Sequence, residues 1–302
     1  MNLTLNQFDI LVEIESNQNI KYTQRYLADK FYLSVGIVNK TIQELIEQEL
    51  IIVEDNSKYK VTIKGYEWLE PHKVKKAIFL AAGFGSRMVP ITLNTPKPLI
   101  KVNGKRIIET LLEAVVNIGI KDITIVRGYL GEQFDILLKD YPNIKFIDNN
   151  MYNEANNISS AYLIKDMLSN AYVLESDLIL YNKSIIRKYE YSTNYIGRPC
   201  SITDDWCFEV KKNIITKVKV GGKDVHHMYG VSYWNKEDAK KMSIDIEDVY
   251  KQPGGKEKYW DEVSLTYCKD HYNILVRQVH EEDIIEIDTY EELKAVDASY
   301  KQ

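Results

Sequence analysis

Apolar and polar residues recur at helical spacing over the start of the chain. Apolar side chains lie three or four positions apart over residues 3–15, which predicts an amphipathic helix. A second, short helix is expected over residues 22–31. Ser34 can cap a third helix that runs to about Leu50, because a serine hydroxyl accepts a hydrogen bond from a free N–H in the first turn. The predicted order is helix, helix, turn, helix.

An alternating segment follows these helices. The pattern predicts two strands, residues 51–53 and 59–63, joined by a polar turn at 54–57, with Gly65 closing the hairpin. A helix-turn-helix followed by a hairpin resembles a winged-helix domain. Residues 70–73, Glu-Pro-His-Lys, then interrupt the pattern. We therefore predict a winged helix-turn-helix domain over residues 1–72 and a catalytic domain over residues 73–302.

Beyond residue 73, hydrophobic strands alternate with amphipathic helices. Strands are expected at 76–80, 122–126, 144–147 and 171–174, and helices at 107–118 and 159–168. This strand-helix-strand order implies parallel strands whose connecting helices cover both faces of the sheet. The predicted fold class is α/β, with a Rossmann-like, mostly parallel mixed sheet preceded by a small winged helix-turn-helix domain.

Composition supports a globular protein of two domains. The chain has 302 residues, 45% apolar and 27% charged, which suits one domain of about 200 residues plus a smaller one. No apolar run approaches the length of a membrane span and acidic residues interrupt the amino-terminal stretch, so we expect a cytoplasmic protein that does not contact a membrane. Cys200, Cys207 and Cys268 lack a C-x-x-C spacing, and we interpret them as reduced thiols.

The charge of the amino-terminal domain disfavours nucleic acid. Residues 1–72 contain seven Lys and Arg against eleven Asp and Glu, a formal charge of −4. The predicted third helix has Lys40 as its one basic residue, whereas a DNA-reading helix should have a basic footprint. Lys58 and Lys60 lie where wing tips touch phosphates, so DNA binding stays an alternative. Dimerisation, giving a homodimer, or packing against the catalytic domain is the preferred role.

A glycine-rich loop follows the first strand of the predicted sheet. Its residues are Leu80, Ala81, Ala82, Gly83, Phe84, Gly85, Ser86 and Arg87. Small residues let backbone N–H groups approach an anion, although two glycines alone also suit a tight turn. Arg87 stands where a Rossmann loop has its third glycine, and the Gly-Lys of a Walker loop is missing. Arg87 and the proline-flanked Lys97 together could neutralise a triphosphate.

Two aspartates are candidate metal ligands. Asp177 follows the strand 171–174, at the carboxyl end where open α/β sheets bind ligands. Asp261 is the second candidate, because Mg²⁺ is usually held by one or two carboxylates together with phosphate oxygens and water. Considered without a family, Asp261 is better explained as a helix cap or a turn residue.

The loop 80–87 and the segment 95–99, Thr-Pro-Lys-Pro-Leu, together form the signature of the sugar-phosphate nucleotidyltransferase superfamily. The chain from Lys75 to Asp288 further resembles the bacterial phosphocholine cytidylyltransferases. The likeness includes residues 128–134, 152–160, 230–234, 259–261 and 286–288. This resemblance implies a nucleotide-diphospho-sugar transferase type of fold.

The resemblance also implies roles for individual residues. Arg87, Lys97, Asp177 and Asp261 would be catalytic, with Asp177 and Asp261 holding Mg²⁺. Asn157, Ser159 and Ser160 would join the loop 80–87 and Lys97 beside the nucleotide. The predicted acceptor-binding residues are Asp205, Trp206, Trp234, Tyr259 and Trp260.

Aromatic residues suit an acceptor with a trimethylammonium group, because that group donates no hydrogen bond and is held over ring faces. Each ring taken singly is also explained as a core or surface anchor. Two departures from the family pattern make a primary ammonium conceivable: Glu175 stands where we expect aspartate, and the pair Asp204-Asp205 is more acidic than usual. His226 and His227 are expected to precede a strand and to be structural or exposed.

The predicted function is transfer of CMP from CTP to phosphocholine with Mg²⁺, giving CDP-choline and pyrophosphate. The acceptor phosphate, with a second pKa of about 6, can attack in line without a protein base. Alternative acceptors are 2-aminoethylphosphonate and phosphoethanolamine. A transcriptional regulator that uses the transferase domain as a ligand sensor is a further alternative, but a pure sensor would not need both metal carboxylates.

Overall fold

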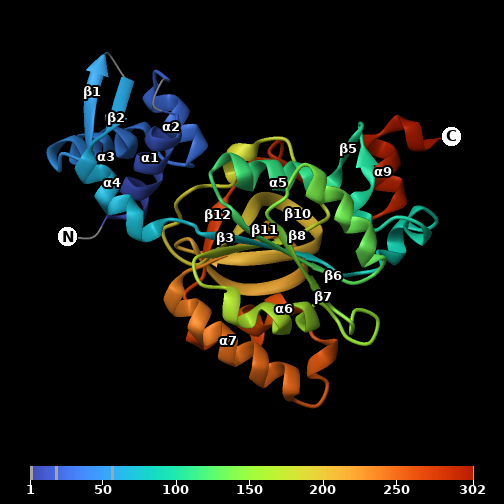
Figure 1. The fold of residues 1–302 in the computed structure, drawn as a ribbon. Coiled ribbons are helices and arrows are strands. Elements are labelled where there is room, and N and C mark those ends of the chain that lie inside the picture. The colour runs from blue at the N-terminus through green and yellow to red at the C-terminus, as the bar shows by residue number, and fades with distance from the viewer. Residues whose placement is uncertain (1–2, 18–19, 56–57, 302) are drawn as a thin grey trace. The chain divides into compact units, whose positions relative to one another are not determined.

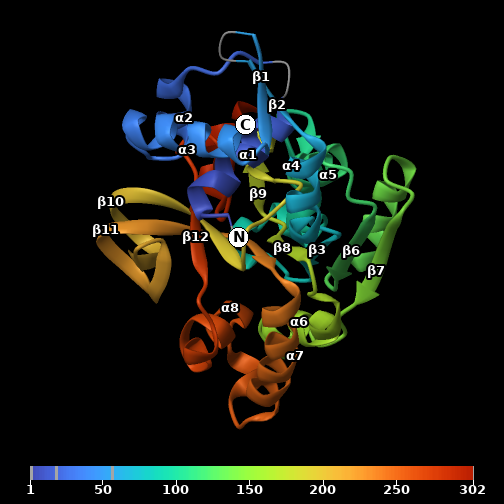
Figure 2. The same ribbon diagram turned by 90° about the vertical axis from the view of Figure 1, so that its left-hand side faces the viewer.

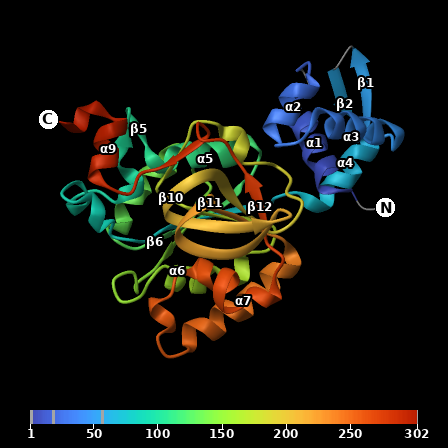
Figure 3. The ribbon, with the colours of Figure 1, turned by 180° about the vertical axis from the view of Figure 1, so that it is seen from behind.

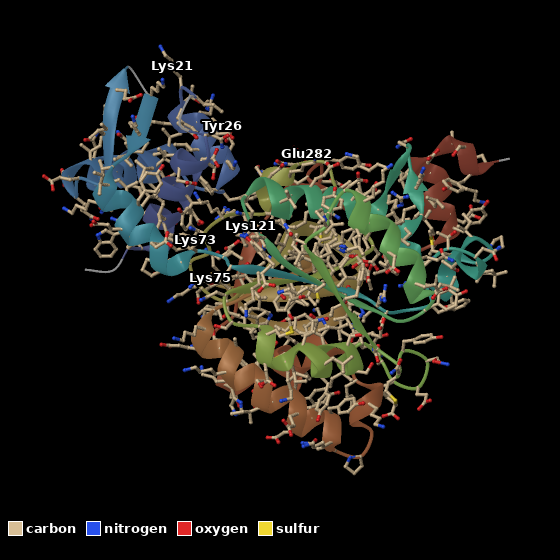
Figure 4. The ribbon with its side chains drawn as sticks, viewed as in Figure 1. Lys21, Tyr26, Lys73, Lys75, Lys121 and Glu282 are labelled. Atoms are coloured by element: carbon tan, nitrogen blue, oxygen red, sulfur yellow. The ribbon has the colours of Figure 1, made fainter. Side chains whose placement is uncertain are left out.

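The computed structural model describes residues 3–17, 20–55 and 58–301. The chain forms two compact units (Figure 1). The first comprises Met1–Val74 and Arg187–Tyr191, and the second comprises Lys75–Ile186 and Ser192–Gln302. Figure 4 labels Lys73 and Lys75, which flank the junction. The amino-terminal unit therefore includes a short segment from the middle of the chain.

The amino-terminal unit has the predicted helix-turn-helix and hairpin (Figure 2). Its elements are α1 (Leu5–Ser16), α2 (Gln24–Lys30), α3 (Val35–Glu47), β1 (Ile51–Asp55), β2 (Lys58–Val61) and α4 (Ile63–Leu69). Ser34 caps α3 as expected, accepting a hydrogen bond from the Ile37 N–H at 3.2 Å. The predicted strand 59–63 is too long, because Thr62 caps α4 through the Gly65 N–H at 3.0 Å. Residues 56–57 of the predicted turn lie outside the described residues.

The segment Arg187–Tyr191 completes the core of this unit. Tyr189 is buried among the apolar side chains of the three helices. The Tyr191 ring lies 5.4 Å from that of Phe8, and its hydroxyl donates to the Leu3 carbonyl at 2.9 Å. The Arg187 guanidinium pairs with Asp9 at 2.5 Å. The winged helix is thus held together by parts of the chain that are far apart in sequence.

The second unit contains a seven-stranded sheet with the order β10-β12-β11-β8-β3-β6-β7. The strands are β3 (Lys76–Ala81), β6 (Asp122–Arg127), β7 (Ile144–Asp148), β8 (Ala171–Glu175), β10 (Asn194–Lys211), β11 (Ile214–Trp234) and β12 (Leu275–Gln278). β3 is parallel to β6 and β8, whereas β11 is antiparallel to β8. This arrangement confirms the predicted mixed, mostly parallel sheet.

Helices cover both faces of the sheet (Figure 1). α5 (Ile107–Asn117) lies on one face, and α6 (Ile158–Ile164) and α7 (Lys236–Lys251) lie on the other. The remaining short elements are β4 (Lys101–Val102), β5 (Lys105–Arg106), β9 (Leu178–Leu180), α8 (Trp260–Glu262), β13 (Ile284–Glu286) and α9 (Tyr290–Val296). No helix in the described ranges combines the length and the apolar character needed to cross a bilayer.

The long hairpin of β10 and β11 is the largest element that the sequence pattern did not predict. It curls on itself (Figure 3), so that Cys207 pairs with both Lys219 and His227. His226 and His227 lie inside β11 and do not precede a strand, which corrects the sequence-based expectation. Adjacent residues of a strand point to opposite faces, so these two histidines have different surroundings.

Candidate active site

A cavity of about 650 Å³ opens at the carboxyl ends of β3 and β8. Its wall is formed by the loop after β3, by residues 149–160, by the end of β8, by the β10–β11 hairpin and by segments 259–262 and 286–288. This is the edge at which open α/β sheets bind ligands. The cavity therefore collects most of the residues that the sequence singled out.

The glycine-rich loop forms one side of the cavity. Gly85 has a φ of 68°, a conformation that favours glycine, and an added Cβ would lie 3.1 Å from the Lys97 Cβ. Every residue from Leu80 to Arg87 lines the cavity except Phe84. The Phe84 ring packs edge-on against Tyr129 at 4.7 Å, so its side chain belongs to the support of the loop.

Lys97 and Arg87 meet at one carboxylate. The Lys97 ammonium lies 2.9 Å from Asp177 Oδ2 and 2.8 Å from Asp288 Oδ1, and the Arg87 guanidinium lies 2.9 Å from the same Asp288 oxygen. Burial lowers the pKa of Lys97, but Asp177 and Asp288 outweigh it and hold this pKa above its ordinary value. Lys97 is therefore charged, and both side chains line the cavity. Asp288 was not among the predicted site residues.

The carboxylates beside Lys97 suit a divalent cation. One oxygen each of Glu175, Asp177 and Glu286 lies within 4.8 Å of the others, and Asp177 Oδ1 is buried without a hydrogen-bond partner among the described residues. Burial, then Asp261 and Asp177, raise the pKa of Glu175 well above its ordinary value. Burial also raises the pKa of Asp261 to about 7, although the Tyr195 hydroxyl donates to it at 2.7 Å. Such crowded oxygens fit Mg²⁺, a hard cation that neutralises them.

Glu175 is held in place by two neighbours. The Asn157 amide donates to Glu175 Oε1 at 3.3 Å, and the backbone N–H of Trp260 fixes that amide by donating to Asn157 Oδ1 at 2.9 Å. An added Cβ on Gly230 would lie 2.4 Å from Glu175 Oε2. A glycine at this position is therefore what leaves room for the longer acid.

Asn149 organises the two predicted serines. Its side-chain amide donates to the hydroxyls of Ser159 and Ser160, both at 2.9 Å, and all three residues line the cavity. Sequence reasoning missed Asn149. Its place immediately after β7, at the carboxyl end of a parallel strand, was the available signal.

Of the four predicted acceptor rings, two face the cavity. Trp206 and Tyr259 line it with ring centroids 5.7 Å apart, and Asp205 lines it beside them. Trp234 and Trp260 are only 0% and 2% exposed and lie in the hydrophobic core. The prediction that these two rings line an acceptor pocket is corrected, because both face the apolar side chains around α6 and α7.

His227 lies next to two residues that line the cavity, Asp205 and Glu286. One ring nitrogen lies within 4.8 Å of oxygens of both Asp205 and Glu286, and Nδ1 lies 3.4 Å from Thr203 Oγ1. His226 faces the other way and contacts the Gln278 amide at 3.2 Å. Burial holds the pKa of His227 below its ordinary value, against the influence of Asp205. Strand alternation was the signal that could have separated the two histidines.

Two family models match the chain, one for each of the two units. A nucleotidyl transferase family model matches residues 76–195, and a MarR family model matches residues 1–58. The chain is 38% identical to the 2-aminoethylphosphonate cytidylyltransferase of Lancefieldella rimae, over 74% of this chain and 92% of that protein. It is 33% identical to the choline-phosphate cytidylyltransferase of Streptococcus pneumoniae, over 75% of this chain and 98% of that protein.

One solved structure shows the same relationship, and a second shows the same fold. The CTP:phosphocholine cytidylyltransferase of Streptococcus pneumoniae superposes with a TM-score of 0.69 at 33% identity, covering 75% of this chain and 99% of that one. The inositol-1-phosphate CTP transferase of T. maritima superposes with a TM-score of 0.59 at 17% identity, covering 76% and 94%, and shares the fold.

Proposed function

Because this chain belongs to the cytidylyltransferases of the nucleotidyl transferase family and has a MarR-family winged helix at its amino terminus, we propose that its acceptor is 2-aminoethylphosphonate. The reaction would join CMP from CTP to the phosphonate and release pyrophosphate. The observation that carries this choice is the part of the cavity wall formed by Asp205, Trp206 and Tyr259, which we call the acceptor wall. It offers one carboxylate and two aromatic rings, where four rings were predicted.

Phosphocholine is the second candidate acceptor. The Trp206 and Tyr259 rings, 5.7 Å apart, could flank a trimethylammonium group. A full aromatic cage would need more ring faces than this pair offers. The Asp205 carboxylate beside the rings binds a group that donates hydrogen bonds more strongly than one that donates none. The wall therefore favours the primary ammonium of the phosphonate.

In the proposed mechanism the protein aligns two anions and offsets their charge. An acceptor oxyanion attacks the α-phosphorus of CTP, a new P–O bond forms, and the bond to the β-phosphate oxygen breaks. A phosphate-type acceptor is largely dianionic near pH 7, so no proton has to be removed and no protein base is required. Arg87 and Lys97 would exchange contacts with Asp288 for contacts with phosphate oxygens.

The metal residues fit this scheme. Mg²⁺ would be held by Asp177 and Asp261, the residues that the family resemblance implies, and would stabilise the charge that develops on the phosphates. Asp177 lies together with Glu175 and Glu286, and the charge of Asp261 acts on Glu175. Asn157 would keep Glu175 oriented, and the loop N–H groups would contact the triphosphate. Ser159 and Ser160, fixed by Asn149, would lie beside the nucleotide.

A pyrophosphate-release panel tests the proposal. ATP, CTP, GTP and UTP are each supplied with 2-aminoethylphosphonate, phosphoethanolamine, phosphocholine or a sugar 1-phosphate, with and without Mg²⁺. We expect release with CTP and 2-aminoethylphosphonate in the presence of Mg²⁺, together with a new CMP conjugate visible by phosphorus NMR. Turnover confined to the sugar phosphate would rule out the assignment.

A further inference from the structure

A second polar cluster lies at the acceptor side of the cavity, next to the metal carboxylates. It consists of Asp205 on β10, His227 on β11 and Glu286 at the end of β13, each offering one atom within 4.8 Å of the other two. Asp205 and Glu286 line the cavity. The cluster is therefore assembled from three strands, with His227 next to the two carboxylates that line the cavity.

Each member has an unused capacity to accept a hydrogen bond. Within the part of the chain that the structure describes, the Glu286 side chain makes no hydrogen bond or ion pair. Asp205 Oδ1 accepts the Trp206 N–H at 2.6 Å, which leaves Oδ2 for another donor. His227 is half-buried, and a neutral imidazole has one nitrogen that accepts. If Nδ1–H donates to Thr203 Oγ1, Nε2 is that acceptor.

We propose that Asp205, His227 and Glu286 form the subsite that binds the amine of the acceptor. Each would accept a hydrogen bond from one N–H of a primary ammonium group. This inference rests on the proposed function. A primary ammonium has three N–H donors, which matches the three acceptors, whereas a trimethylammonium group has none. A site built to bond N–H groups rejects an analogue that lacks them by a large factor, because its polar groups stay unpaired.

The position of Glu286 sets the length of the acceptor. Glu286 belongs both to this cluster and to the cluster of Glu175 and Asp177, so the amine subsite lies directly beside the metal carboxylates. Phosphorus held at Lys97 would therefore be separated from the amine by a short chain. A two-carbon linker suits this separation better than a sugar ring does.

The experiment compares two adjacent histidines. His227→Phe removes the proposed acceptor atom and keeps a ring, and His226→Phe is the matched control, because His226 contacts Gln278 and does not belong to the cluster. We measure kcat and KM for 2-aminoethylphosphonate, phosphocholine and CTP with each full-length variant. His227→Phe should raise the KM for 2-aminoethylphosphonate at least about 10-fold and leave the KM for CTP unchanged, whereas His226→Phe should change neither.

Phosphocholine and metal titrations complete the test. The kcat/KM for phosphocholine should be low in the wild type and should not fall further in His227→Phe. Asp205→Asn, a second variant of the cluster, should show the same acceptor-specific rise in KM. These readouts separate loss of a contact to the amine, which raises the KM for the acceptor, from a general loss of folding, which would lower the apparent kcat with every acceptor and leave KM unchanged.

Three results would overturn the subsite. Wild-type enzyme that prefers phosphocholine would refute both the subsite and the proposed acceptor, while leaving cytidylyl transfer intact. Equal damage in the two histidine variants would assign His227 a structural role only. A changed Mg²⁺ requirement in His227→Phe, with acceptor KM unaltered, would assign the cluster to a metal. Absence of pyrophosphate release with every amine acceptor would instead refute the proposed function itself.

Discussion

Lys97 is the side chain on which the charge balance of the cavity depends, because it contacts Asp177 and Asp288 at once. We predict that Lys97→Met lowers kcat/KM for CTP at least about 100-fold, the usual effect of losing one preorganised electrostatic group. Lys101→Met is the matched control, since Lys101 is exposed on β4, and it should stay within about twofold. Initial rates at fixed acceptor check this. Wild-type activity in Lys97→Met would show that the phosphates are neutralised elsewhere.

Gly230 is a second residue with a specific consequence. Gly230→Ala places a Cβ at 2.4 Å from Glu175 Oε2, so Glu175 must move away from its contact with Asn157. We predict a loss of kcat of about 10- to 100-fold and a higher Mg²⁺ concentration for half-maximal rate, because small displacements in an active site are costly. Gly36→Ala, at an open position of α3, should leave the rate unchanged. Equal rates in the two variants would contradict a role for Glu175.

At the scale of elements, α3 shows what kind of surface the winged helix presents. Val35 and Ile37 are each 43% exposed in its first turn, and Lys40 is its one basic residue. Figure 4 also labels Tyr26 on α2, 47% exposed. An apolar surface with little positive charge suits a protein partner, such as a second copy of the chain, better than a phosphate backbone.

We therefore predict weak or undetectable DNA binding by the full-length protein. A mobility-shift titration at low salt, with random and promoter-derived duplexes, measures it, and light scattering of the same sample reports the oligomeric state. Tight, saturable and sequence-selective binding at moderate salt would overturn the prediction. Glu substitutions at Val35 and Ile37 should weaken any dimer without changing cytidylyl transfer.

Local patterns in the sequence were sufficient for some elements and insufficient for others. The loop 80–87 and the parallel strands β3, β6 and β8 were predicted because their signals lie within a few consecutive residues. The burial of Trp234 was not predictable, because it depends on which face of β11 meets the helices. Strand alternation could have separated His227 from His226, but the approach of His227 to Asp205 was not predictable, because it depends on how the β10–β11 hairpin curls on itself.

At the scale of the whole molecule, the segment Arg187–Tyr191 ties the winged helix to the middle of the chain. The local sequence of this segment did not predict its place in the amino-terminal core. Its partners, Phe8 and Asp9 among them, are distant in sequence. A domain boundary placed at residue 72 from composition therefore omits a part of the amino-terminal core.

Removing that segment should destabilise the amino-terminal unit. We predict that Tyr189→Ala lowers its free energy of unfolding by about 3–5 kcal/mol, as for other large aromatic side chains deleted from a core. A fragment of residues 1–74 should likewise melt at a lower temperature than the unit in the intact chain, and a synthetic peptide of residues 186–192 should restore part of the difference. Circular dichroism measures all three. A fragment as stable alone as with the peptide would contradict the prediction.

The shared core also has a consequence for the order of events on the ribosome. An amino-terminal domain ordinarily folds as a unit while later parts of the chain are still being synthesised. Here Tyr189 and Tyr191 leave the exit tunnel only after several strands of the second unit have been made. We expect the nascent winged helix to expose apolar surface during that interval and to be protected from proteases only once translation has passed Tyr191. Stalled nascent chains of increasing length, probed by limited proteolysis, would show at which residue protection begins.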